Sequence, residues 1–113
     1  KLVYDTGNPV GHKQDPWDYY TKVRKDIVYV HIKDGIWSEA DNKATYIWCG
    51  EGKGDVLRIL RDLLKTGYDG GFSIEPHLKM QVHLGTDAAA GEKYKSYLEY
   101  GRRLMKLVEQ AKA

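Results

Sequence analysis

The sequence predicts an α/β fold made of three successive strand–helix units. Three short apolar runs, at residues 2–4, 27–32 and 71–75, each precede a polar or glycine-containing loop. Each loop leads into a segment whose apolar residues recur at helical spacing. Strands that alternate with helices in this way form a parallel sheet with right-handed crossovers. We therefore expect parallel strands joined by helices.

The first unit is a strand at residues 2–4 followed by a helix that ends near residue 25. A glycine–asparagine–proline sequence at residues 7–9 ends the strand in a loop. Asp15 followed by Pro16 is typical of a helix N-cap with proline in the first turn. The apolar side chains of this helix are Trp17, Tyr20 and Val23.

The second unit is a strand at residues 27–32, a long loop at residues 33–53 and a helix. The strand is β-branched and nearly continuously apolar, which is typical of a parallel strand buried on both faces. Asp55 is expected to cap the helix and Gly67 to end it. Its apolar face comprises Val56, Leu57, Ile59, Leu60, Leu63 and Leu64.

The third unit is a strand at residues 71–75, a polar loop to about Asp87 and a helix over residues 88–111. Pro76 lacks a backbone N–H, so the strand is expected to end at Glu75. Three parallel strands leave two edges with unpaired backbone groups. We therefore expect this sheet to need a partner.

Composition excludes several classes of function. The chain has 113 residues, a mass of 12.9 kDa and a net charge of +2, which gives no argument for nucleic acid or an anionic membrane. No apolar run approaches the roughly 18 residues of a membrane-spanning helix. Cys49 is the single cysteine, which suits a reducing compartment, so we expect a cytoplasmic protein. The chain starts inside an apolar run without Met, which predicts a fragment.

Chemically capable side chains follow all three predicted strands. Asp5 follows the first, His31 and Asp34 lie at the end of the second, and Glu75 and His77 at the end of the third. The carboxyl ends of parallel strands share the edge where ligands bind. Carboxylates with one imidazole suit Mn²⁺, Mg²⁺, Co²⁺ or Zn²⁺. This pattern predicts a divalent metal site.

Each of these residues also has a structural interpretation. Asp5 precedes a turn sequence and is able to organise that turn through its side chain. His31 lies in an apolar strand, where a hydrogen-bonded core histidine is common, and Glu75 has Lys33 as a possible ion-pair partner. The metal interpretation depends on all three strands contributing together.

Four short motifs follow one another along the chain. They are Asp5-Thr6-Gly7-Asn8, Val30-His31-Ile32-Lys33-Asp34, Gly50-Glu51-Gly52-Lys53-Gly54-Asp55 and Ser73-Ile74-Glu75-Pro76-His77. In this order they resemble the xylose-isomerase-like sugar isomerase/epimerase family. The resemblance covers essentially the whole chain and implies the last three βα units of a (β/α)₈ TIM-type barrel. Such a barrel takes about 250 residues, so residues 1–113 are expected to be the C-terminal fragment of a single domain. That fragment would self-associate or pair with the missing N-terminal part.

The resemblance implies a divalent metal held by four ligands, of which Asp5, His31 and Glu75 match three and an upstream Glu is absent. It also implies proton transfer next to a carbonyl through an enediolate, with Glu75 as one of two acid–base groups. The substrate would be a sugar or sugar-like molecule, and carbohydrate metabolism the setting. The expected substrate contacts are Asn8, Lys33, Trp37 and His77.

This sequence departs from the family pattern at two places. Asn8 stands where many of the family's epimerases have His, and residues 33–53 lack the substrate-holding Arg of some members. Three alternatives therefore stay open: a catalytically inert half-barrel, an inosose-type dehydratase, and an apurinic-site endonuclease. Residues 46–49 lack the Asp-Arg-His motif that the endonuclease requires, which makes it the weakest of the three.

Several other signals receive structural interpretations. Residues 50–54 could cradle a phosphate, but they do not fit a P-loop, and a tight loop beside the following helix is favoured. Trp17 is expected in the core, whereas Trp37 and Trp48 are candidates for the wall of a sugar pocket. Cys49 has no neighbouring base in the sequence and is not expected to be a nucleophile.

Overall fold

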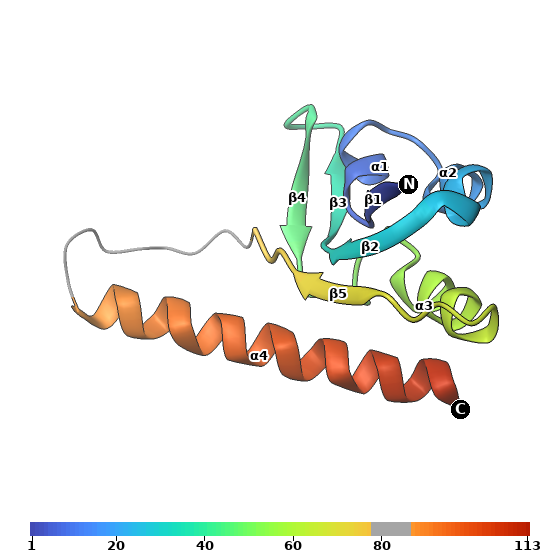
Figure 1. Ribbon diagram of the computed structural model, residues 1–113. Coiled ribbons are helices and arrows are strands. Elements are labelled where there is room, and N and C mark those ends of the chain that lie inside the picture. Colours follow the sequence, from blue (N-terminus) through green and yellow to red (C-terminus); the bar gives the residue numbers. More distant parts are fainter. Residues whose placement is uncertain (78–86) are drawn as a thin grey trace.

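The computed structural model describes residues 1–77 and 87–113 and has a mixed α/β fold (Figure 1). A three-stranded sheet and a separate hairpin are joined to helices. The elements in chain order are β1 (Leu2–Asp5), α1 (Asn8–Gly11), α2 (Pro16–Val23), the 3₁₀ turn η1 (Arg24–Asp26), β2 (Ile27–Ile32), β3 (Asp34–Ser38), β4 (Lys43–Ile47), α3 (Val56–Lys65), β5 (Gly71–Ile74) and α4 (Asp87–Lys112).

The three-stranded sheet has the order β1-β2-β5, and both strand pairs are parallel. Asp5 in β1 lies beside His31 in β2, which in turn lies beside Ser73 in β5. The predicted parallel α/β arrangement is therefore confirmed. That the sheet is part of a (β/α)₈ barrel stays a prediction.

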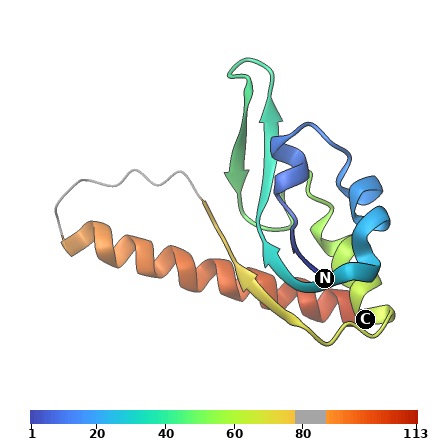
Figure 2. The ribbon, with the colours of Figure 1, turned by 45° about the horizontal axis from the view of Figure 1, so that its top comes forward.

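The hydrophobic core lies on one face of this sheet. Alternate strand residues point to it, and α3 and α4 pack side by side against the same cluster (Figures 1 and 2). Because side chains alternate along a strand, Asp5 and His31 point to the opposite face, away from these helices. The buried core residues are Tyr4, Tyr20, Ile27, Val30, Ile32, Cys49, Val56, Ile59, Leu60, Leu63, Tyr100, Leu104 and Ala111.

Helix termini follow two of the three predicted signals. Asp15 caps α2, since its carboxylate accepts the N–H of Asp18 at 2.9 Å. Gly67 follows the end of α3 with φ +87°, a conformation that glycine adopts without steric cost. Asp55 occupies the N-cap position of α3, but the prediction that its side chain caps the helix is wrong. Its backbone is left-handed and its carboxylate instead lies 3.7 Å from Arg58.

The prediction of a loop over residues 33–53 is also wrong, because this segment contains an antiparallel hairpin. Strands β3 and β4 pair in register, with Trp37 opposite Ala44, and Figure 2 shows the hairpin standing away from α4. β-branched and aromatic residues in both arms favour strands, and Asn42 in the turn has a left-handed φ of 51°. The short helix α1 likewise occupies residues that were expected to form a loop.

Most of the loop predicted before Asp87 lies outside the described residues. In the part of the chain that the structure describes, no helix combines the length and the apolar character needed to cross a membrane. Helix α4 is the longest element and runs alongside β5 and α3 (Figure 1). The prediction of a long final helix is confirmed over the described residues.

Candidate metal centre

The structure brings Asp5, His31 and Glu75 together. Each offers one ligand atom, and these three atoms all lie within 4.8 Å of one another. Asp5 ends β1, His31 is its neighbour in β2, and Glu75 follows β5. The N–H of Glu75 donates to the carbonyl oxygen of Ile32 at 2.8 Å, so the strand pairing continues one residue past β5. Strand register therefore fixes where all three side chains start.

Glu75 is linked to two histidines. Its Oε1 lies 2.9 Å from Nδ1 of His31, and its Oε2 lies 3.7 Å from Nε2 of His77. The side chains of His31 and Glu75 are about one third exposed. The alternative in which Glu75 pairs with Lys33 is not what the structure shows, since Glu75 pairs with His31 instead. A substrate on this open face would have access to the carboxylate.

Asp5 uses its two carboxylate oxygens differently. Oδ1 accepts the N–H groups of Gly7 and Asn8 at 2.8 and 3.0 Å, which organises the turn after β1. Oδ2 lies 3.5 Å from the ammonium of Lys33. The turn interpretation and the ligand interpretation of Asp5 are thus compatible, because the turn's N–H groups use only one of the two carboxylate oxygens.

Lys33 is an internal cation beside this cluster. Its Nζ donates to Oδ1 of Asn8 at 3.0 Å and lies 4.7 Å from the ring centroid of Tyr46. The side chains of Lys33 and Asp5 are each only 10 % exposed. Asn8 and Lys33 thus lie beside Asp5, and His77 lies beside Glu75, whereas their contact with a substrate stays a prediction.

The two tryptophans that were candidates for a pocket wall, Trp37 and Trp48, lie in different surroundings. Trp37 lies in β3, where the ammonium of Lys13 is 4.7 Å from its ring centroid. Trp48 packs against the core beside Tyr100, and Arg103 covers its ring at 4.1 Å. The suggestion that Trp48 walls a sugar pocket is therefore wrong. Trp17 packs against the core as predicted.

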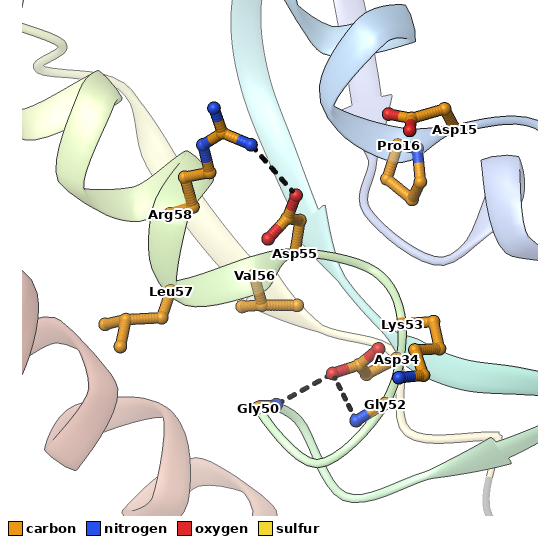
Figure 3. Close-up of a pocket in the computed structure, with 10 residues that line it drawn as sticks. All are labelled: Asp15, Pro16, Asp34, Gly50, Gly52, Lys53, Asp55, Val56, Leu57 and Arg58. Atoms are coloured by element: carbon orange, nitrogen blue, oxygen red, sulfur yellow. Dashed lines mark hydrogen bonds and ion pairs between the residues drawn. The ribbon is translucent and has the colours of Figure 1, made fainter.

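Asp34 is fully buried and binds the glycine loop at residues 50–54. Its Oδ1 accepts the N–H groups of Gly35 and Gly54 at 2.8 and 2.9 Å. Its Oδ2 accepts those of Gly50 and Gly52 at 2.8 and 3.1 Å, as Figure 3 shows. Burial raises the pKa of Asp34, and these four hydrogen bonds, which favour the ionised form, oppose that rise. The loop N–H groups are therefore occupied by a carboxylate of the chain itself.

This geometry gives Asp34 and the glycine loop structural roles. Asp34 is a structural anchor and does not belong to the metal cluster, and the glycine loop does not offer a free phosphate cradle. A cavity of about 400 Å³ lies beside this loop, at the start of α3 (Figure 3). Its lining includes Asp34, Asp55 and Arg58 but none of the cluster residues. The tight-loop interpretation of residues 50–54 is confirmed.

Sequence reasoning missed two residues that shape the site. Thr6 is fully buried, and its hydroxyl donates to the carbonyl oxygen of Lys33 at 2.6 Å and accepts the N–H of Lys33 at 3.0 Å. Tyr46 reaches from β4 toward both Lys33 and His77. Thr6 directly follows a strand-ending Asp, which is a weak local signal. Tyr46 gave none, because it lies in the hairpin that was not predicted.

The donor set fits a divalent cation. Two carboxylates and one imidazole are ligands for Zn²⁺, Mn²⁺ and related ions, with metal–ligand distances of about 2.0–2.2 Å. Ligand atoms on one ion then lie roughly 3–4 Å apart, and the observed atoms lie within 4.8 Å of one another. Three protein ligands leave coordination positions for water or substrate, as in catalytic sites.

Comparison with protein-family models, with curated proteins and with solved structures finds no match for this chain. The class that the fold and site define is therefore an α/β protein with a parallel sheet and a candidate metal cluster at the carboxyl ends of its strands.

Proposed function

We propose that this chain is part of a divalent-metal-dependent isomerase or epimerase that acts on a sugar or sugar-like substrate. The observation that carries the proposal is the convergence of Asp5, His31 and Glu75 from three neighbouring parallel strands. Ligand sites of parallel α/β proteins lie at this edge. The sequence resemblance to the sugar isomerase/epimerase family supports the same activity.

Glu75 is the residue proposed to transfer the proton. Its carboxylate is about one third exposed and borders the open face of the sheet. A carboxylate within hydrogen-bond reach of a C–H next to a carbonyl can take that proton. A bound divalent metal would stabilise the negative charge that develops on the carbonyl oxygen. His31 holds one oxygen of Glu75, which fixes the orientation of the carboxylate.

The surrounding groups suit a polyhydroxylated substrate. Asn8 and Lys33 present an amide and an ammonium beside Asp5, and His77 lies next to Glu75. These groups donate or accept hydrogen bonds with hydroxyl and carbonyl oxygens. Trp37, in strand β3 of the hairpin, is the proposed apolar contact for the substrate.

The metal content of the purified chain tests the cluster directly. Desalted wild-type protein, analysed by inductively coupled plasma mass spectrometry after loading with Mn²⁺ or Zn²⁺, is expected to hold about one ion per chain. The variant with Asp5→Asn, His31→Gln and Glu75→Gln is expected to hold none. Glu109→Gln on α4 is the matched control, since this carboxylate pairs with Lys112 and is 69 % exposed. Equal metal content in wild type and triple variant would sink the proposal.

Proton exchange by the metal-loaded wild-type protein tests the chemistry, and Glu75→Gln, which is also expected to lose the metal, shows whether exchange depends on the cluster. In D₂O, ketoses and aldoses incubated with the loaded protein are expected to gain deuterium at the carbon next to the carbonyl, as seen by NMR. Glu75→Gln is expected to abolish this exchange. Stoichiometric metal without exchange would favour the inert half-barrel, and loss of water from an inosose would favour the dehydratase.

A further inference from the structure

Lys33 is held in place from its backbone to its ammonium. Its N–H and carbonyl oxygen both bond to the hydroxyl of Thr6. The side chain passes so close to Gly7 that a Cβ there would lie 2.8 Å from Cγ of Lys33. The ammonium then reaches Asn8 and the face of Tyr46. A lysine restrained at every level is a fixed charge, in contrast to a mobile surface lysine.

The contact between this charge and Asp5 is loose. Nζ of Lys33 is 3.5 Å from Oδ2 of Asp5, whereas charge-assisted N–H···O bonds are about 2.7–2.9 Å. The ammonium makes its 3.0 Å hydrogen bond to the neutral amide of Asn8 instead. Oδ2 therefore feels the positive charge while it keeps its lone pairs for another partner. Asp5, a member of the candidate cluster, thus lies beside a fixed ammonium.

We infer that Lys33 is a built-in competitor of the metal for Asp5, so that its charge weakens metal binding at the Asp5–His31–Glu75 cluster. This inference rests on the metal centre of the proposed function and adds what sets its affinity. A cation that binds Oδ2 is repelled by an ammonium a few ångströms away, and the small exposure of both side chains limits screening. Removal of the charge therefore strengthens binding.

If Lys33 is only a structural support for Asp5, removal of its charge is expected to weaken metal binding. Removal of a group that orients a metal ligand typically lowers metal affinity about 10- to 100-fold. The sign of the change therefore separates the two roles. Lys33→Met keeps the length and apolar stem that pack on Gly7 and deletes only the charge, whereas Lys33→Arg keeps the charge.

Titration calorimetry with MnCl₂ and ZnCl₂ at fixed pH measures this sign. Lys33→Met is expected to bind at least about tenfold more tightly than wild type, and Lys33→Arg no more tightly than wild type. Lys13→Met is the matched control, because Lys13 also pairs with a carboxylate, Glu39, and stacks on an aromatic ring, Trp37. It is expected to leave metal affinity unchanged.

The outcomes separate this inference from the proposed metal centre. Wild-type binding with equal or weaker binding by Lys33→Met overturns the competitor role and leaves the centre standing. No binding by either protein overturns both. Tight binding by Lys33→Met that Glu75→Gln abolishes in the same background supports both. Circular dichroism and the melting temperature verify folding, and Lys33→Gln replaces Lys33→Met in the titration if the Met variant does not fold.

Discussion

Two carboxylates near the ends of neighbouring strands differ in how their oxygens are hydrogen-bonded. Asp34, just past β2, is fully buried, and four backbone N–H groups occupy both of its oxygens. Asp5, at the end of β1, accepts two backbone N–H groups on one oxygen, and its other oxygen lies 3.5 Å from the ammonium of Lys33. The same side chain is an anchor in one place and a candidate ligand in the other.

The difference lies in how many backbone donors the following chain supplies. Residues 50–54 return over Asp34 and close on it, and their glycines allow the backbone to approach the carboxylate. The turn after β1 supplies two donors to Asp5 and then leads away into α1. Saturated hydrogen bonding therefore marks the structural carboxylate, whereas the candidate ligand Asp5 has backbone donors on only one oxygen among the described residues.

The largest effect is expected for Asp34→Ala. Loss of the carboxylate leaves three N–H groups of the glycine loop and the N–H of Gly35 without their acceptor, and each buried unpaired group costs about 1–3 kcal/mol. Partial entry of water reduces the total, so we expect a loss of about 3–5 kcal/mol in the free energy of unfolding. Urea denaturation followed by circular dichroism measures it. Asp41→Ala, in the exposed hairpin turn, is the control, and an equal small effect for both variants would contradict the anchor role.

Gly52→Ala tests the same anchor from the side of the loop. A Cβ at this position would overlap Oδ1 of Asp34 and lie 2.6 Å from the carbonyl oxygen of Gly35. Because backbone cannot yield as a flexible side chain does, we expect a loss of about 2–3 kcal/mol. The control is Gly101→Ala in α4, where a Cβ meets nothing within 4 Å and helix propensity favours alanine by roughly 0.5–1 kcal/mol. Thermal melts should therefore shift in opposite directions.

The contrast between these carboxylates was only partly accessible from sequence. The spacing of apolar runs gave the strand–helix order, and the position of Asp5, His31 and Glu75 after the strands gave the cluster, because parallel strands share one edge. Nothing in the sequence distinguished Asp34 from Asp5, since both are acidic residues near strand ends. The distinction arises from a loop that returns across 16–20 residues, a long-range contact that local patterns do not encode.

The hairpin was missed for a different reason. Its arms contain β-favouring residues such as Ile36, Thr45 and Tyr46, but polar residues and glycine interrupt the alternation that marks a strand. Because the hairpin was not predicted, neither was the position of Tyr46, whose ring lies beside the ammonium of Lys33. The part of the site that the β3–β4 hairpin contributes was therefore missed together with the hairpin.

Cys49 reports on the anchored loop without a mutation. It is buried just before Gly50, and burial, reinforced by the charge of Asp34, raises the pKa of its thiol to about 11. At pH 8 we expect alkylation by iodoacetamide to be at least about a hundredfold slower in the folded protein than in urea, where the pKa is about 8.5. Because the thiolate is the reactive form, the folded rate should rise about tenfold per pH unit up to pH 10. A plateau above pH 9 would contradict the raised pKa.

The smallest effect on stability is expected in the candidate metal cluster, to which Asp5 belongs. Glu75→Gln removes one charge of the His31–Glu75 pair, but both side chains are about one third exposed, and such pairs contribute about 0–1 kcal/mol. We expect the free energy of unfolding to change by less than about 1 kcal/mol while metal binding is lost. A loss as large as that of Asp34→Ala would mean that Glu75 is a structural group like Asp34. If Glu75→Gln loses the metal but keeps its stability, the carboxylate of Glu75 serves a ligand and is not needed by the fold.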